Sequence, residues 1–217
     1  MFPTDLVVHR RVEVIDDAYF NVGCTHSTFS SENYVSFNDA WYSWLQRSLR
    51  FRRISTCSTA WFTAAGCTCK YKYGNYKITP VDIPYPLRRL GKIICRKLGI
   101  KDLPNCVNVN VYINGSEHIP PHSDDEELFQ GKVQPITILS ISFGHSRDFK
   151  LRWNSGGTEK IVSLDSGDVL TMTGMCQRFC KHSVPAVVDD VSDDRVRYNL
   201  TYRWLVKHDS SCPQCSQ

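Results

Sequence analysis

The chain lacks a long hydrophobic run, and no uncharged apolar stretch reaches the roughly eighteen residues that a membrane-spanning helix needs. Its first ten residues include Asp5, His9 and Arg10 and contain no apolar segment of the kind found in signal peptides. Internal repeats and low-complexity segments are also missing, which excludes solenoids and disordered arrays. We therefore expect a globular protein of the cytoplasm or nucleus that is neither secreted nor inserted in a membrane.

Cysteine, in contrast, is abundant, with ten residues scattered along the chain. Without a signal peptide, such scattered cysteines favour reduced thiols in a reducing compartment. Cys212 and Cys215 have the two-residue gap of half a zinc knuckle, and Cys67-Thr68-Cys69 could supply the other half. No sequence rule joins the two pairs, so zinc is not expected and the tail thiols are predicted to be exposed to solvent.

Positive charge is concentrated in one part of the chain. Residues 40–105 hold thirteen lysines or arginines and two aspartates, a net charge of +11, which leaves −7 for the rest of a chain whose total is +4. Such segregation predicts that a polyanion, nucleic acid above all, meets this segment. The alternative is that these charges lie on the solvated faces of two helices.

A chain of 217 residues and 24.9 kDa is long enough for a single domain with a sizeable core. Two amphipathic helices are predicted in its first part, one capped by Asn38 and one opened by Pro86 and ended by Gly99. Their apolar positions follow a spacing of three and four residues: Trp41, Trp44, Leu45 and Leu49 in the first, and Leu87, Leu90, Ile94 and Leu98 in the second.

After Pro104 the pattern changes to short β-rich runs separated by turn residues. These runs cover residues 106–113, 136–143, 147–153, 159–164, 168–173 and 196–206. Their spacing predicts an α+β fold in which N-terminal helices pack against a double-stranded β-helix, or jelly roll. We expect residues 1–217 to form one domain: about 1–105 helical and basic, about 106–206 the jelly-roll core, and 207–217 a polar tail.

Two histidines and one carboxylate suggest a metal site. His122 and Asp124 are two residues apart, so on a strand or at its end they project to the same side and can reach one ion. With His182 they would complete the set of two histidines and a carboxylate that holds Fe(II) and leaves three positions open for a 2-oxo acid and dioxygen. The spacing alone is weak, because the chain has five other histidines.

The last strand strengthens this interpretation. Strict alternation from Val196 to Trp204 places Arg197, Asn199, Thr201 and Arg203 on one face and apolar residues on the other. Two arginines in such a row are costly to bury unless an anion meets them, and the planar guanidinium suits a carboxylate. On the strand 106–113, Asn108, Asn110 and Tyr112 also share a face and could supply neutral donors to the same acid.

Taken together, the motifs resemble the AlkB family of Fe(II)/2-oxoglutarate dioxygenases over about residues 60–206. The motifs are Asn110-Val111-Tyr112, His122-Ser123-Asp124-Asp125-Glu126, His182 and Arg197-Tyr198-Asn199-Leu200-Thr201-Tyr202-Arg203. The segment 119–126 is also similar to versions carried in RNA-virus replicases, which favours RNA as substrate.

The resemblance implies roles for individual residues. His122, Asp124 and His182 would bind iron, while Asn110, Tyr112, Arg197, Asn199 and Arg203 would surround 2-oxoglutarate. Asp125 and Glu126 would lie beside the target base, and His122 would form one wall of the base pocket. The opposite aromatic wall would come from a nucleotide-recognition lid within residues 1–105, where Tyr71, Tyr73 and Tyr76 are interleaved with lysines; we select Tyr76.

The resemblance implies an enzyme that uses Fe(II), 2-oxoglutarate and O2 to remove N-alkyl groups, of the 1-methyladenine or 3-methylcytosine type, from RNA or single-stranded DNA. Formaldehyde would be released. We expect a monomer with methylated nucleic acid as its partner. Two alternatives are a protein hydroxylase or demethylase with the same iron chemistry, and a nucleic-acid-binding module without catalysis.

Overall fold

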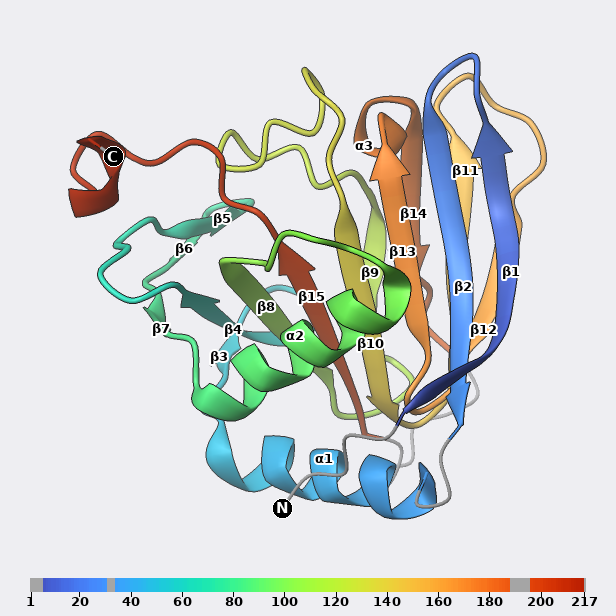
Figure 1. Cartoon of the computed structure of the whole chain (residues 1–217), viewed down its shortest axis with the longest axis horizontal. Helices are drawn as coiled ribbons and strands as arrows, with labels where there is room; N and C mark the ends of the chain where they lie inside the picture. The colour runs from blue at the N-terminus through green and yellow to red at the C-terminus, as the bar shows by residue number, and fades with distance from the viewer. Residues whose placement is uncertain (1–5, 31–33, 188–195, 217) are drawn as a thin grey trace.

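The computed structural model describes residues 6–30, 34–187 and 196–216. Two sheets face each other, and the helices α1 and α2 lie on the outer side of the larger sheet (Figure 1). This arrangement confirms the predicted α+β class with a jelly-roll core and helices packed against it. None of the helices in the described segments is long and apolar enough to cross a membrane.

In the described residues the larger sheet has the order β1-β2-β13-β10-β15-β8-β4-β3, with β7 beside β4. Its strands are β1 (Val7–Asp17), β2 (Val22–Ser30), β3 (Arg52–Arg53), β4 (Ser58–Thr63), β7 (Val81–Asp82), β8 (Cys106–Tyr112), β10 (Ile138–Gly144), β13 (Val169–Gly174) and β15 (Arg197–Arg203). The smaller sheet has the order β12-β11-β14-β9. Its strands are β12 (Lys160–Leu164), β11 (Arg147–Trp153), β14 (Cys180–Val184) and β9 (Ile119–His122).

A hairpin of β5 (Tyr71–Tyr73) and β6 (Tyr76–Ile78) stands beside the two sheets (Figure 1). The helices are α1 (Tyr34–Ser48), α2 (Tyr85–Leu98) and the short α3 (Cys176–Phe179), followed near the C-terminus by the 3-10 helix η1 (Pro213–Ser216). The six predicted β-rich runs all correspond to strands, and their ends differ by a few residues at most.

The second predicted helix is confirmed as α2, with Pro86 in its first turn and Gly99 in a left-handed conformation at its end. Its apolar stripe packs on the face of β15 that carries Tyr198, Leu200 and Tyr202. The approach is close: a Cβ on Gly91 would lie 2.9 Å from the ring of Tyr202, whose hydroxyl donates to the carbonyl oxygen of Leu87 at 2.7 Å. Helix α2 therefore covers the apolar face of β15, and the polar face of β15 points into the space between the two sheets.

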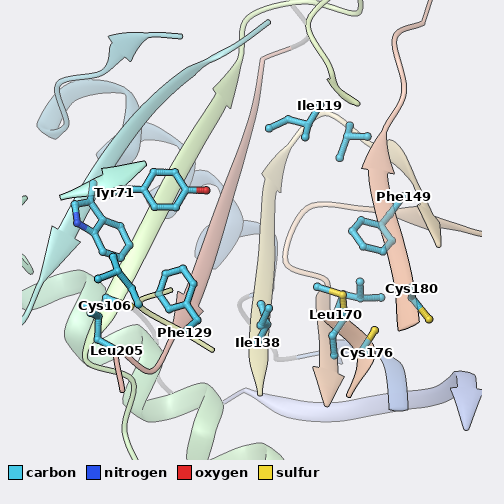
Figure 2. Close-up of a cluster of buried hydrophobic side chains, with 14 of the residues drawn as sticks. Tyr71, Cys106, Ile119, Phe129, Ile138, Phe149, Leu170, Cys176, Cys180 and Leu205 are labelled. Atoms are coloured by element: carbon cyan, nitrogen blue, oxygen red, sulfur yellow. The ribbon is translucent and has the colours of Figure 1, made fainter. Parts of the chain in front are cut away.

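That space is filled at its ends by apolar side chains of both sheets (Figure 2). Ile138 and Leu170 come from the larger sheet and Phe149 from the smaller one, while Phe129 lies on the loop that follows β9. Burial of this apolar surface stabilises the folded state by roughly 25 cal/mol per Å². This core joins the two sheets around a polar centre.

Two expectations for the N-terminal part are wrong. Residues 1–105 are not mainly helical, because β1 and β2 extend the larger sheet through β13, and β4 pairs with β8. Asn38 does not cap α1 but lies within it and donates from Nδ2 to the carbonyl oxygen of Ser166 at 3.1 Å. The pairing of β2 with β13 joins residues 142 to 152 positions apart, and that of β4 with β8 joins residues 43 to 53 apart. Such long-range pairings leave little trace in a local periodicity.

The expectation of exposed tail thiols is wrong for Cys212, which is buried against the loop between β4 and β5. The chain continues past β15 and folds back onto this loop, so residues 207–214 are not a free polar tail. The side chain of Cys215 lies outside the described residues. The smaller sheet also contains two strands that were not predicted, β9 and β14; Pro120 and Pro121 mask β9, because proline is rare within a sheet.

Candidate metal centre

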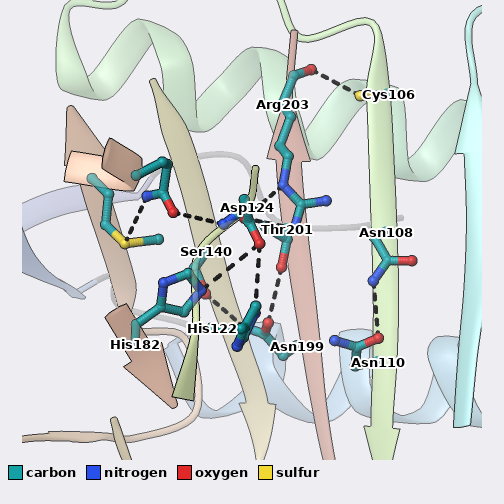
Figure 3. A network of polar contacts seen from close by, with 12 residues as sticks. Cys106, Asn108, Asn110, His122, Asp124, Ser140, His182, Asn199, Thr201 and Arg203 are labelled. Atoms are coloured by element: carbon teal, nitrogen blue, oxygen red, sulfur yellow. Dashed lines mark hydrogen bonds and ion pairs between the residues drawn. The ribbon is translucent and has the colours of Figure 1, made fainter. Parts of the chain in front are cut away.

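The three predicted metal ligands meet at the inner face of the smaller sheet (Figure 3). His122 ends β9, and His182 lies opposite it in register on β14. Asp124 follows His122 by two residues, and its Oδ1 lies 3.5 Å from Nε2 of His122 and 3.9 Å from Nε2 of His182. All three ligand atoms are within 4.8 Å of one another. One ion can therefore contact two imidazoles and one carboxylate here.

Asp124 is oriented by partners that leave one oxygen for a metal. Its Oδ2 accepts hydrogen bonds from Nε and Nη2 of Arg203 at 2.8 and 2.7 Å, and its backbone N–H donates to Oε1 of Gln177 at 2.9 Å. Its Oδ1 is buried and has no hydrogen-bond partner among the described residues. Burial would raise the pKa of Asp124, but Arg203 and the two histidines outweigh burial and hold this pKa far below its usual value.

The two histidines are held with one nitrogen toward the carboxylate. Nδ1 of His122 donates to the carbonyl oxygen of Pro120 at 2.9 Å, which leaves Nε2 facing Asp124. The ring of His182 stacks on Phe149 with centroids 5.4 Å apart. Burial, assisted by neighbouring His122, lowers the pKa of His182 to about 3. His182 is therefore a neutral imidazole at physiological pH, the form that binds metals.

A cavity opens next to these ligands, between the two sheets. Arg197 is 1% exposed at the wall of this cavity, where its guanidinium carbon lies 5.3 Å from the ring centre of Tyr112. Nη2 donates to Oγ of Ser142 at 2.9 Å, but Nε and Nη1 have no partner among the described residues. Burial lowers the pKa of Arg197 from its usual value. A buried cation with unused donors is a site for a small carboxylate.

The other residues predicted around 2-oxoglutarate also line this cavity. Asn199 lies on β15 and donates from Nδ2 to Oγ of Ser140 at 2.7 Å. Asn110 lies opposite it on β8 and accepts from Nδ2 of Asn108 at 2.9 Å. Tyr112 pairs in register with Arg197. The polar faces of β8 and β15 thus form one continuous wall (Figure 3).

Arg203 also lines the cavity but points its guanidinium at Asp124, as described above. The strand spacing explains the division between the two arginines, because residues six apart on a strand are separated by about 20 Å. In the structure Arg197 has hydrogen-bond donors without a partner among the described residues, whereas Arg203 holds the carboxylate of Asp124. Contact of Arg203 with 2-oxoglutarate stays a prediction, and its Nη1 has no partner among the described residues.

Of the residues predicted for the base pocket, some line the cavity and others do not. Tyr71 and Tyr73 of β5 line the cavity, whereas Tyr76 of β6 is 36% exposed and is not among the lining residues. Asp125 is exposed and pairs with Lys132. Glu126 lines a neighbouring hollow, and its burial, together with Asp124, raises its pKa to about 7. The roles of Tyr76, Asp125 and Glu126 beside a base stay predictions.

Sequence reasoning missed three polar residues of this site. Ser140 and Ser142 are signalled by alternation in Ile138-Leu139-Ser140-Ile141-Ser142-Phe143, which places both hydroxyls on the inner face of β10. Gln177 has no sequence signal, because it lies on a helix of four residues and reaches Asp124 only through the tertiary fold.

Comparisons with known proteins agree with this geometry. The model of the 2OG-Fe(II) oxygenase superfamily matches residues 33–203. The DNA oxidative demethylase ALKBH2 of Arabidopsis thaliana is 26% identical over 205 residues, covering 81% of this chain and 62% of the relative. The mouse (Mus musculus) protein of the same name is 35% identical over 151 residues, covering 65% of this chain and 59% of the relative. The chain thus spans about six tenths of the length of these curated relatives.

The solved structure of OsALKBH1 has a TM-score of 0.58 at 17% identity and covers 83% of this chain and 96% of its own. A 2OG-Fe(II) oxygenase family oxidoreductase from Burkholderia pseudomallei has a TM-score of 0.50 at 14% identity and covers 76% of this chain and 75% of its own. At these identities the likeness concerns the fold, and it matches the two facing sheets described above.

Proposed function

This chain belongs to the AlkB family within the 2OG-Fe(II) oxygenase superfamily, and on that premise we propose that it demethylates N-alkylated bases of nucleic acid by oxidation. The observation that carries the proposal is one cavity lined both by the three predicted metal ligands and by Arg197, a buried arginine with unused donors. The relatives named DNA oxidative demethylase support a nucleic acid as substrate.

The residues of the cavity fit the groups that this chemistry requires. Asp124 Oδ1, His122 and His182 would hold Fe(II), and Arg197 would hold a carboxylate of 2-oxoglutarate with Nε and Nη1. When bound, Fe(II) and 2-oxoglutarate would supply the oxidation of an N-methyl group by O2, with formaldehyde, succinate and CO2 as the products. Apolar side chains such as Ile119 and Val184 line part of the cavity, and the ring of Phe149 stacks on that of His182.

Methylation at N1 of adenine or N3 of cytosine blocks Watson-Crick pairing and adds a positive charge. Such a base costs less to extrude from a stack than a paired one. Tyr73 and His122 both line the cavity, and their flat rings could stack on the base. The carboxylates of Asp125 and Glu126 come three and four residues after His122. A cationic methylated base is therefore the substrate class that we propose.

Formaldehyde release tests this function. The chain should be incubated with Fe(II), 2-oxoglutarate and oligonucleotides of one sequence, prepared as single-stranded DNA, duplex DNA and RNA with 1-methyladenine or 3-methylcytosine. We expect release from at least one methylated nucleic acid and none from the unmethylated strand. Release from a methylated peptide alone would contradict the proposal and favour a protein demethylase. Binding without formaldehyde or 2-oxoglutarate turnover would favour a non-catalytic module.

We also propose which basic residues contact the phosphates, from their position relative to the cavity. Lys72 and Lys77 are exposed on the β5–β6 hairpin, next to the cavity-lining Tyr71 and Tyr73. Helix α2 lies on the side of the larger sheet that faces away from the cavity (Figure 1). Its basic residues, among them Arg88 and Arg96, line a hollow on the surface of that helix. We therefore propose that the hairpin contacts the nucleic acid and that the charges of α2 do not.

Salt dependence separates the two groups of charges. Replacing Lys72 and Lys77 together by alanine should weaken binding of a methylated oligonucleotide and reduce the slope of log K against log salt by about 2, because each lost phosphate contact removes about one counterion. The matched pair Arg88→Ala with Arg96→Ala should leave the slope unchanged. The reverse result would place the nucleic acid on α2.

A further inference from the structure

A second group of metal-ligating side chains lies outside the cavity. Cys67 and Cys69 come from the loop between β4 and β5, and His208 and Cys212 come from the segment that follows β15. Their three sulfurs and the Nδ1 atom of His208 are all within 4.8 Å of one another. The three cysteines are buried, at 6%, 0% and 3% exposure in chain order. Segments about 140 residues apart thus bring four donor atoms to one point.

The distances between these atoms are those of the corners of a tetrahedron. Nδ1 of His208 lies 3.7, 3.5 and 3.5 Å from the sulfurs of Cys67, Cys69 and Cys212, and the sulfurs of Cys67 and Cys212 are 3.8 Å apart. Zn–S bonds of about 2.3 Å and Zn–N bonds of about 2.05 Å would separate two sulfurs by about 3.8 Å and sulfur from nitrogen by about 3.6 Å. The observed separations agree with both values.

Neither a disulfide nor plain apolar packing fits the cluster as well as a metal does. A disulfide between Cys67 and Cys212 would need an S–S distance of about 2.05 Å, far below the 3.8 Å observed. Apolar packing does not account for the backbone N–H groups that point at the sulfurs. The N–H of Thr68 donates to Sγ of Cys212 at 3.4 Å, and that of Asp209 donates to Sγ of Cys69 at 3.3 Å. Such donors stabilise the negative thiolates that bind a metal.

We propose that Cys67, Cys69, His208 and Cys212 bind one structural Zn²⁺ ion. Three thiolates and one imidazole form a closed tetrahedral set, and this set leaves no position for substrate. The sequence interpretation that zinc is not expected is thereby reversed. It paired Cys212 with Cys215, whereas the structure pairs Cys212 with His208, four residues earlier on the chain.

The proposed ion ties the C-terminal segment to the hairpin that borders the active-site cavity. Two residues of β4 hold the loop: Nε1 of Trp61 donates to the carbonyl oxygen of Cys69 at 2.9 Å, and Oγ1 of Thr63 donates to that of Cys67 at 3.1 Å. Cys69 is followed two residues later by Tyr71, which lines the cavity. A metal link between these distant segments would restrict the hairpin and the end of β15 together.

Metal analysis of the purified full chain tests the proposal. After EDTA treatment and gel filtration, which strip the open iron site first, we expect about one zinc per chain by mass spectrometry. Cys69→Ser and His208→Ala should lose this zinc, whereas His208→Cys, which restores a fourth ligand, should keep it. The control Cys95→Ser, at a buried cysteine of α2, should also keep it. Folded wild-type chain without zinc, and unable to take it up, would overturn the proposal.

A cobalt spectrum answers the same question without relying on the variants. Co²⁺ bound here should give thiolate-to-metal charge-transfer absorption and the intense visible bands of a tetrahedral ion. Co²⁺ at His122, Asp124 and His182 has no thiolate ligand and gives no such charge transfer. Added Zn²⁺ should remove the bands. Absence of thiolate bands from cobalt-loaded, folded chain would refute the zinc site even if the variants fail to fold.

Discussion

Replacement of His182 by alanine should reduce 2-oxoglutarate turnover and formaldehyde release by more than about 100-fold. Loss of a residue that only hydrogen-bonds to a metal ligand already lowers metal affinity or activity about 10- to 100-fold, and His182 would be a ligand itself. The substitution leaves Asp124 Oδ1 with one imidazole instead of two. The measurement is the initial rate of succinate formation at saturating Fe(II) and 2-oxoglutarate.

Folding must be separated from metal loss, because His182 is buried against Phe149. The thermal midpoint should therefore be measured with and without Fe(II) under argon. We expect iron to raise the midpoint of the wild-type chain and to leave that of His182→Ala unchanged. His9→Ala, at an exposed histidine of the edge strand β1, is the matched control and should retain full turnover and the iron-dependent shift. Wild-type turnover by His182→Ala would remove His182 from the metal site.

The second large effect is expected at Arg197. Arg197→Lys should raise the KM for 2-oxoglutarate about 10- to 100-fold, because hydrogen bonds to a charged group contribute about 1.5 to 3 kcal/mol and lysine lacks the planar fork. The rate at saturating 2-oxoglutarate should fall much less, since the metal ligands are untouched. The observation behind this prediction is that Nε and Nη1 of Arg197 are buried without a partner among the described residues.

Arg152→Lys, at an exposed arginine of β11, is the matched control and should leave the KM unchanged. Isothermal titration of 2-oxoglutarate into chain loaded with Mn²⁺ in place of iron would measure the affinity apart from the reaction. If Arg197→Lys kept both the KM and the affinity of the wild type, the carboxylate would have to lie elsewhere, and Nη1 of Arg203 would be the next donor to test.

Local sequence patterns determined strand β15 and the helix α2 that covers its apolar face. Alternation in residues 197–203 correctly separates the polar wall of the cavity from the face under α2, because a strand sends successive side chains to opposite sides. The proline and glycine at the ends of α2 are equally local signals. The sequence motifs also predict His122, Asp124 and His182 as the metal ligands, and the structure brings their ligand atoms within 4.8 Å of one another.

Only the tertiary structure decided which of these residues work together. Arg203 orients Asp124 across 79 positions of sequence, and Gln177 supports the same carboxylate from a four-residue helix. Cys67 and Cys212 meet across 145 positions, so the spacing of cysteines along the chain could not reveal their partner. Hydrogen bonds and metal ligation depend on distances of a few ångströms in space. The pairing of strands, and not the order of residues, sets those distances.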